Sequence, residues 1–154
     1  IIYPTSNSGY GIGQKSKFCD ENSPLNPISL YGRTKAQAEK IVMQHSNFVA
    51  FRLATIFGYS YRMRTDLLVN NFVEKSINSR RLDIFEPHFR RNFVHIRDVV
   101  SSFIFAIENF SKVKNKLKFN QDYSVQFGIK ELIKNFKRGK FKTVSKLGNY
   151  NIEK

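Results

Sequence analysis

The sequence predicts an α/β fold built on a mainly parallel sheet. Short apolar runs alternate with longer segments of helical periodicity, and this alternation is typical of parallel strands joined by helices. The 154 residues are enough for one domain with a sizeable core, and 41% of them are hydrophobic, as in ordinary globular proteins. We therefore expect residues 1–154 to belong to a single domain.

The periodicity of the apolar residues defines the expected elements. Four residues of the first helix are spaced to form one buried side: Leu30, Ala38, Ile41 and Val42. Four residues of the third helix are spaced in the same way: Val99, Phe103, Ala106 and Ile107. We expect strands at 1–3, 47–54, 81–86 and 117–120, and helices at 29–44, 66–77, 95–110 and 129–136.

The charge of the chain raises the question of an anionic partner. The formal net charge is +14 and the pI is about 10.0. The lysines are spread among Asn, Ile and Phe, however, and there is no zinc-finger spacing, basic zipper or RNA-binding aromatic motif. We favour a solvated basic face and do not expect a nucleic-acid partner, although a basic nucleic-acid-binding domain stays open as an alternative.

The cysteine content and the lengths of the apolar runs indicate the cellular compartment. Its single cysteine, Cys19, cannot form an intrachain disulfide and agrees with a reducing compartment. No run approaches the roughly 18 apolar residues of a membrane span, and no signal peptide is visible before the apolar start at Ile1. We expect a cytoplasmic protein without a membrane segment.

Two apparent motifs do not fit a binding site. The run GYGIG at 9–13 would need a glycine in place of Gln14 to fit a dinucleotide-binding loop, so a tight turn is the better interpretation. The histidines His45, His88 and His95 have no acidic or cysteine partner at metal-ligand spacing, and we expect no metal site.

The pair Tyr31 and Lys35 is the strongest candidate for chemistry. Residues four apart share one face of a helix, with their Cβ atoms about 6 Å apart. A nearby ammonium favours the phenolate form of a tyrosine, which could then exchange a proton with an alcohol or carbonyl. The alternative is a packed aromatic residue beside one more surface charge, and spacing alone does not decide between the two.

Four ordered motifs give this pair a context. They are YPTSNSGYG at 3–11, NPISLYGRTKAQAE at 26–39, FRLATIFG at 51–58 and RRNFVHIRDVV at 90–100. With them the chain closely resembles the extended short-chain dehydrogenase/reductase family, the nucleotide-sugar epimerases and dehydratases. The resemblance covers at least residues 1–110. It implies a partial Rossmann-type sheet, with residues 1–58 in the second half of the dinucleotide-binding domain and 59–154 mixing substrate-binding and returning Rossmann elements.

The resemblance also implies roles for individual residues. Tyr31 would be the acid/base on a sugar hydroxyl, Lys35 would bind the nicotinamide ribose of NAD or NADP, and Ser6 would hydrogen-bond the same sugar oxygen. Ala54 would also contact the cofactor. Substrate contacts would come from Ser6 and three further residues: Thr55, Asn70 and Arg91. Arg91 would bind the diphosphate of a nucleotide-diphosphate sugar; otherwise it is only one of a basic pair with Arg90, and Asn70 is merely exposed.

Departures from the family pattern favour one of the family's reactions over another. The 4,6-dehydratase branch carries T-D-E where this chain has Ser6, Asn7 and Ser8, so elimination of water lacks its acid and base. A UDP-glucose 4-epimerase-like reaction, with hydride removed and returned through a keto-sugar, fits better. Thr55 replaces the family's usual asparagine. A related dehydratase or reductase and a non-catalytic degenerate fragment remain alternatives.

The glycine-rich cofactor loop of the family is expected ahead of Ile1 and is not in this sequence. We therefore expect the chain alone to be inactive. The family also suggests a homodimer for the full-length protein.

Overall fold

The computed structural model describes residues 1–13, 18–110, 122–139 and 142–143. The chain divides into two compact units. Unit 1 contains Ile1–Thr55 and Val100–Phe119, and unit 2 contains Ile56–Val99 and Asn120–Lys154. In the described part of the chain, no helix combines the length and the apolar character needed to cross a membrane. The predicted α/β class with parallel strands is confirmed.

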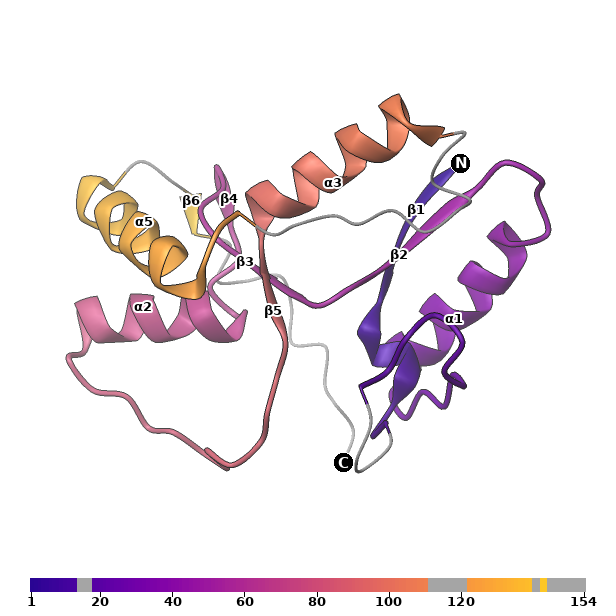
Figure 1. Cartoon of the computed structure of the whole chain (residues 1–154). Coiled ribbons are helices and arrows are strands. Elements are labelled where there is room, and N and C mark those ends of the chain that lie inside the picture. Colours follow the sequence, from indigo (N-terminus) through magenta and orange to yellow (C-terminus); the bar gives the residue numbers. More distant parts are fainter. Residues whose placement is uncertain (14–17, 111–121, 140–141, 144–154) are drawn as a thin grey trace. The chain divides into compact units, whose positions relative to one another are not determined.

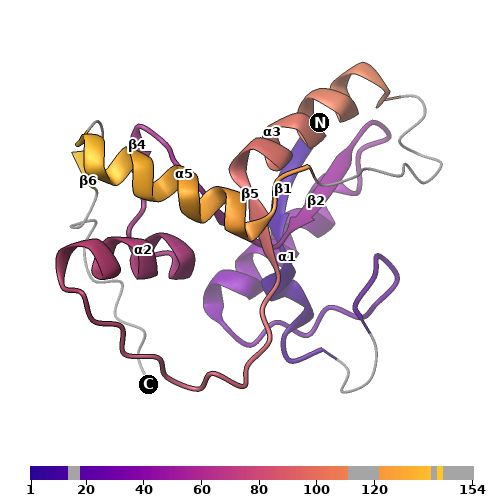
Figure 2. The ribbon, with the colours of Figure 1, turned by 60° about the vertical axis from the view of Figure 1, so that its left-hand side comes forward.

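Unit 1 is built around two parallel strands, β1 (Ile2–Ser6) and β2 (Val49–Leu53), which lie side by side in Figures 1 and 2. The helix α1 (Leu30–Val42) connects them and packs against β1. Parallel neighbours need such a crossover because the end of the first strand and the start of the next lie at opposite edges of the sheet. The strands expected at 1–3 and 47–54 are thus neighbours in a parallel sheet, and the helix expected at 29–44 lies between them in the chain.

The buried side of α1 differs from the predicted one. Leu30 is 72% exposed and Ile41 is 60% exposed, whereas Gly32 and Glu39 are buried. A Cβ atom at Gly32 would lie 2.9 Å from the carbonyl oxygen of Ser8, so the helix approaches that loop more closely than a side chain would allow. The spacing of apolar residues could not reveal that the buried side of this helix contains the carboxylate of Glu39.

Arg52 is the partner of that carboxylate. Its Nε donates to Glu39 Oε1 at 2.8 Å, and its Nη1 donates to the hydroxyl of Tyr10 at 3.0 Å and to the carbonyl of Glu21 at 3.1 Å. The Tyr10 hydroxyl in turn donates to the carbonyl of Asp20 at 2.9 Å. Burial lowers the pKa of the Arg52 guanidinium, but the hydrogen bonds to Glu39 and Tyr10 outweigh it and leave that pKa raised.

The loop after β1 turns tightly, as the glycine-rich run predicts. A 3₁₀ turn, η1 (Asn7–Tyr10), follows the strand and ends at Gly11, which has a φ of 65°. A Cβ atom there would lie 2.0 Å from the carbonyl oxygen of Asn26, so only glycine fits.

Unit 2 contains two short strand pairs and two helices. The strand β3 (Thr55–Phe57) pairs with β5 (Phe93–His95), and β4 (Arg62–Met63) pairs in parallel with β6 (Lys142–Thr143). The helices α2 (Leu68–Asn78) and α5 (Val125–Arg138) lie side by side in Figures 1 and 2. Their apolar sides enclose the core of this unit: Phe57, Met63, Val69, Val73 and Leu132.

The strand expected at 81–86 is absent. The segment has no strand assignment, and Ile84 and Phe85 are 57% and 87% exposed. Arg80 and Glu86 have φ values of 52° and 49°, which interrupt extended backbone at both ends of the segment. The prediction was wrong because alternating apolar residues form a strand only where another strand can pair with them.

The helices of the second half begin at other residues than predicted. The helix α3 (Ile96–Glu108) starts after His95, because His95 closes β5. Val99 and Ala106 are buried as predicted, but Ile107 is 65% exposed.

The last helix begins earlier than residue 129. It starts at Val125, where the hydroxyl of Ser124 accepts a hydrogen bond from the N–H of Phe127 at 3.1 Å. The expected strand at 117–120 lies outside the described residues.

A buried amide joins the end of β3 to the segment before α2. Asn70 is only 2% exposed. Its Oδ1 accepts from the N–H of Gly58 at 3.2 Å, and its Nδ2 donates to the carbonyl of Arg64 at 2.9 Å. Both ends of the amide therefore satisfy backbone groups that would otherwise lose a partner.

Replacing Glu39 by Gln should destabilise the protein by about 3 kcal/mol, because it leaves a largely buried guanidinium without its counter-ion. Urea unfolding followed by circular dichroism measures the loss. Asp83→Asn is the control, since it breaks the exposed Arg81–Asp83 pair and should cost less than about 1 kcal/mol. Equal losses in the two variants would show that the Glu39–Arg52 pair contributes no more than a surface pair.

Replacing Asn70 by Ala should lower the free energy of unfolding by about 2 kcal/mol, because an N–H and a carbonyl lose their partner. The same urea experiment measures it. Ser76→Ala on the exposed side of α2 serves as the control and should change stability by less than about 0.5 kcal/mol. A neutral effect of Asn70→Ala would mean that water replaces the amide and that its packing is dispensable.

Candidate active site

The carboxyl ends of β1 and β2 bring several candidate residues to one edge of the sheet. Ser6 is the last residue of β1 and lies opposite Leu53 in the parallel register. Ala54 and Thr55 follow β2 directly. In open α/β sheets ligands bind at this edge, outside the carboxyl ends of the strands. Ser6, Ala54 and Thr55 therefore lie at the same edge of this sheet.

The hydroxyl of Ser6 is held by its own loop. Its Oγ accepts from the N–H of Ser8 at 3.2 Å and donates to Ser8 Oγ at 3.1 Å, and the residue is half-buried. This arrangement fixes the Oγ at the start of η1 and leaves acceptor capacity on the oxygen.

Tyr31 lies in the first turn of α1 and is 56% exposed. Its ring is not part of the buried core, and its hydroxyl makes no hydrogen bond to any residue that the structure describes. The helix begins next to it because the hydroxyl of Ser29 accepts from the N–H of Gly32 at 3.0 Å. An exposed phenol on a capped helix end can meet a substrate hydroxyl.

Lys35 lies one turn further along α1 and is half-buried. Its Nζ donates to the carbonyl of Pro4 at 3.1 Å and lies 5.2 Å from the ring centroid of Tyr3. The ammonium thus contacts β1 through both residues. Lys35 is recognisable from the sequence, whereas Tyr3 and Pro4 are not, because their contact with Lys35 spans about thirty residues of chain.

The remaining two candidates belong to unit 2. Asn70 is buried, and its amide is already hydrogen-bonded at both ends. Arg91 is exposed in the segment that leads into β5. The structure therefore groups Ser6, Tyr31, Lys35, Ala54 and Thr55 in unit 1 and places Asn70 and Arg91 in the other unit.

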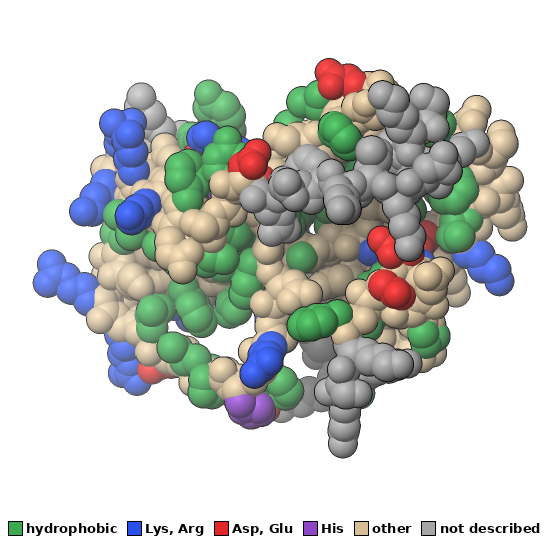
Figure 3. Space-filling view, in the orientation of Figure 1, with side chains coloured by type: hydrophobic (Ala, Val, Ile, Leu, Met, Phe, Trp, Pro, Cys, Tyr) green, Lys and Arg blue, Asp and Glu red, His purple; other side chains and the backbone are tan. Residues whose placement is uncertain are grey.

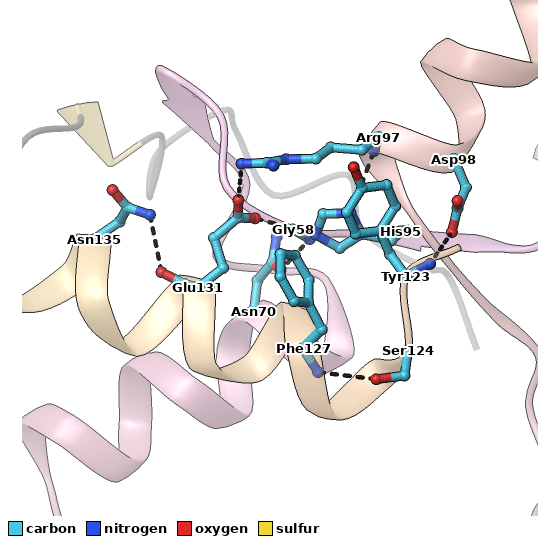
Figure 4. Close-up of polar contacts among 10 residues, drawn as sticks. All are labelled: Gly58, Asn70, His95, Arg97, Asp98, Tyr123, Ser124, Phe127, Glu131 and Asn135. Carbon is cyan, nitrogen blue, oxygen red and sulfur yellow. Dashed lines mark hydrogen bonds and ion pairs between the residues drawn. The ribbon is translucent and has the colours of Figure 1, made fainter. Parts of the chain in front are cut away.

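A second cluster of polar groups surrounds a buried histidine in unit 2 (Figure 4). His95 is 0% exposed, and its Nε2 lies 3.1 Å from Glu131 Oε2, while Nδ1 accepts from the N–H of Arg97 at 3.3 Å. Figure 4 shows Arg97 reaching the same carboxylate, with the ring of Phe127 packed beside the imidazole. These contacts indicate that His95 is a satisfied interior residue.

Glu131 also explains why the sequence offered no partner for His95, since the two are 36 positions apart. Within the described ranges, no group of three or more His, Cys, Asp or Glu side chains could hold a metal ion.

Comparison with known proteins identifies relatives among the UDP-sugar 4-epimerases. Two curated relatives are informative. A probable UDP-glucuronate 4-epimerase of Rhizobium meliloti is 27% identical over 110 residues, which are 68% of this chain and 32% of the relative. The UDP-glucose 4-epimerase of Lactobacillus helveticus is 23% identical over 90% of this chain and 48% of its own length. The chain spans about a third to a half of the length of these relatives.

Solved structures share the fold. The UDP-glucose 4-epimerase of Thermotoga maritima with UDP-glucose has a TM-score of 0.75 at 18% identity, over 90% of this chain and 63% of that one. The UDP-glucuronic acid 4-epimerase of Bacillus cereus with NAD has a TM-score of 0.73 at 20% identity, over 90% and 60%. A dTDP-glucose 4,6-dehydratase of Bacillus anthracis with NAD has a TM-score of 0.72 at 14% identity, over 89% and 61%.

The family itself is shown by a profile match along most of the chain. The profile described as the NAD dependent epimerase/dehydratase family matches residues 1–123. The match contains all four motifs on which the resemblance to extended short-chain dehydrogenases/reductases rests. Together with the parallel strands and their helical crossover, it shows that the chain belongs to the NAD dependent epimerase/dehydratase family.

Proposed function

We propose that the protein is an NAD(P)-dependent nucleotide-sugar 4-epimerase of the UDP-glucose 4-epimerase type, and that this chain carries its proton-transfer groups. The observation that carries the proposal is Tyr31, an exposed phenol one helical turn from Lys35 on a helix that packs against the strand ending at Ser6. The UDP-sugar 4-epimerases among the relatives support this choice of reaction.

The three side chains have separate tasks in this proposal. Tyr31 takes the proton from a sugar hydroxyl as the carbon beneath it loses hydride, and later returns a proton to the carbonyl. The positive charge of Lys35 stabilises the phenolate form of Tyr31, which is the form that accepts this proton and is regenerated when the proton is returned. The Ser6 hydroxyl, which donates to Ser8 Oγ in this structure, would exchange that partner for the same sugar oxygen and keep the oxygen in line for the transfer.

The residues present fit a nicotinamide nucleotide. The uncommitted Tyr31 hydroxyl and the half-buried Lys35 ammonium are donors suited to a ribose diol, and Ala54 lies at the edge of the sheet where such nucleotides bind. NAD or NADP, when bound, would supply acceptance and return of the hydride. The chain itself supplies position, polarity and the proton.

The substrate in this proposal is a nucleotide-diphosphate sugar. Arg91 is suited to its diphosphate because a guanidinium can bind phosphate oxygens with two parallel hydrogen bonds. Thr55, at the carboxyl end of β2, would face the sugar. For Asn70 to contact the substrate, its amide would have to exchange its bonds to Gly58 and Arg64.

Two alternatives are less well supported. A dehydratase related to the Bacillus anthracis enzyme shares the fold, but elimination of water needs an acid and a base, and Asn7 and Ser8 supply neither. For nucleic-acid binding, a concentrated basic patch would be expected. On the face that Figure 3 shows, most of the Lys and Arg side chains lie at the left, and hydrophobic and neutral side chains separate them from one another.

Tyr31→Phe removes the proton carrier and keeps the ring, so turnover should fall by about 10²- to 10⁴-fold while the Kd for UDP-glucose changes little. Because the chain spans only part of its relatives, the assay uses a protein in which a glycine-rich cofactor-binding half precedes Ile1. Lys35→Met should weaken both cofactor binding and turnover. The control is Tyr61→Phe, an 83% exposed tyrosine of unit 2. Unchanged turnover in Tyr31→Phe would show that Tyr31 does not transfer the proton and is only a surface residue.

Arg91→Ala should weaken binding of UDP-glucose by about 10- to 100-fold, the loss expected for charge-assisted hydrogen bonds to a diphosphate. Its effect on turnover at saturating substrate should be small. Isothermal titration of the same extended protein gives the Kd. Arg90→Ala is a matched control in the neighbouring residue and should leave the Kd near the wild-type value. Similar losses in both variants would mean a diffuse basic surface and no dedicated phosphate ligand.

A further inference from the structure

The ammonium of Lys35 has two partners, and both come from β1. Its Nζ donates to the Pro4 carbonyl at 3.1 Å, and the ring of Tyr3 lies beside it with the centroid 5.2 Å away. Tyr3 and Lys35 are both half-buried. An ammonium at this distance from an aromatic face is attracted by the ring quadrupole, whose face is electronegative although the ring is neutral.

The sheet explains why the Pro4 carbonyl is available. The N–H of Val49 bonds to the carbonyl of Ile1 at 2.8 Å, which starts the ladder between the two strands. Along a strand, carbonyls point alternately to one neighbour and the other, so those of Ile1, Tyr3 and Thr5 face β2 and that of Pro4 faces away. Lys35 therefore uses a carbonyl that the pairing with β2 leaves free.

We propose that Tyr3 is a positioning residue of the active site: the face of its ring, together with the Pro4 carbonyl, fixes where the Lys35 ammonium lies. This inference rests on the proposed function, in which that charge stabilises the Tyr31 phenolate. A lysine has four rotatable side-chain bonds, so a single carbonyl leaves its head free to swing. The ring adds a second contact from the same strand and restricts that motion.

The alternative is that Tyr3 only fills space under α1. Two substitutions separate the roles, because Tyr3→Phe keeps the aromatic face and Tyr3→Leu keeps apolar bulk without it. If Tyr3 only packs, the effect of each substitution should follow the change in side-chain volume. If Tyr3 positions Lys35, Tyr3→Phe should behave like the wild type, and Tyr3→Leu should lose the contact with the Lys35 ammonium.

The first measurement uses the chain itself and needs no activity. The ring current of Tyr3 should move the ε-CH₂ resonances of Lys35 upfield of the other lysines in ¹H–¹³C spectra, and Lys35→Met identifies them by their loss. The displacement should persist in Tyr3→Phe and disappear in Tyr3→Leu, with both variants folded by circular dichroism. Should Tyr3→Leu not fold, Tyr3→Met gives the same test with an adaptable side chain. Unmoved Lys35 resonances in a folded Leu or Met variant would overturn the proposal.

The second measurement is turnover of the extended protein. Tyr3→Leu should lower kcat by about 10- to 100-fold, the scale of a displaced catalytic group, with an unchanged Kd for UDP-glucose, and Tyr3→Phe should restore kcat. A Tyr3→Leu variant with wild-type kcat would overturn the positioning role. Wild-type turnover in Tyr31→Phe would instead refute the proposed function, while the Lys35 resonances would still show whether the ring of Tyr3 lies against the Lys35 side chain.

Discussion

The ion pair between Glu39 and Arg52 is the interaction on which unit 1 depends. One guanidinium, on β2, ties together α1 through Glu39, the turn after β1 through Tyr10 and the following loop through the Glu21 carbonyl. Only arginine offers enough donors in a rigid plane to serve three segments at once. Because buried ion pairs are costly to desolvate, the net contribution of this pair to stability is limited. Its main effect is to permit a single arrangement of the three segments.

That arrangement is what gives Tyr31 and Ser6 a common setting. Glu39 lies on the same helix as Tyr31, and Arg52 lies next to the residue paired with Ser6. A helix that could slide or rotate on its strands would carry the phenol and the ammonium with it. Because the crossover is pinned at Glu39 and at the close approach of Gly32 to Ser8, both groups are presented from a fixed helix end.

The fold was predictable from the sequence to the extent that local patterns decide it. The parallel pairing of the first strand with the FRLA strand and the helix between them followed from alternation of short apolar runs with helical ones. The segment 81–86 has the same kind of pattern and forms no strand. Leu30 and Ile41 have helical spacing and are exposed. In each failure the missing information was the partner, since burial depends on what lies opposite.

The sequence by itself determined the family and supplied the candidate reactive groups, because ordered motifs record residue types and their spacing. Tyr31, Lys35 and Ser6 could be named from it. Only the tertiary structure decided which groups hold them: that Lys35 rests on Tyr3 and Pro4, that Glu39 enters the interior, and that the Asn70 amide is already occupied. These contacts join residues far apart in the chain, and their strength depends on distance and burial, which no linear pattern encodes.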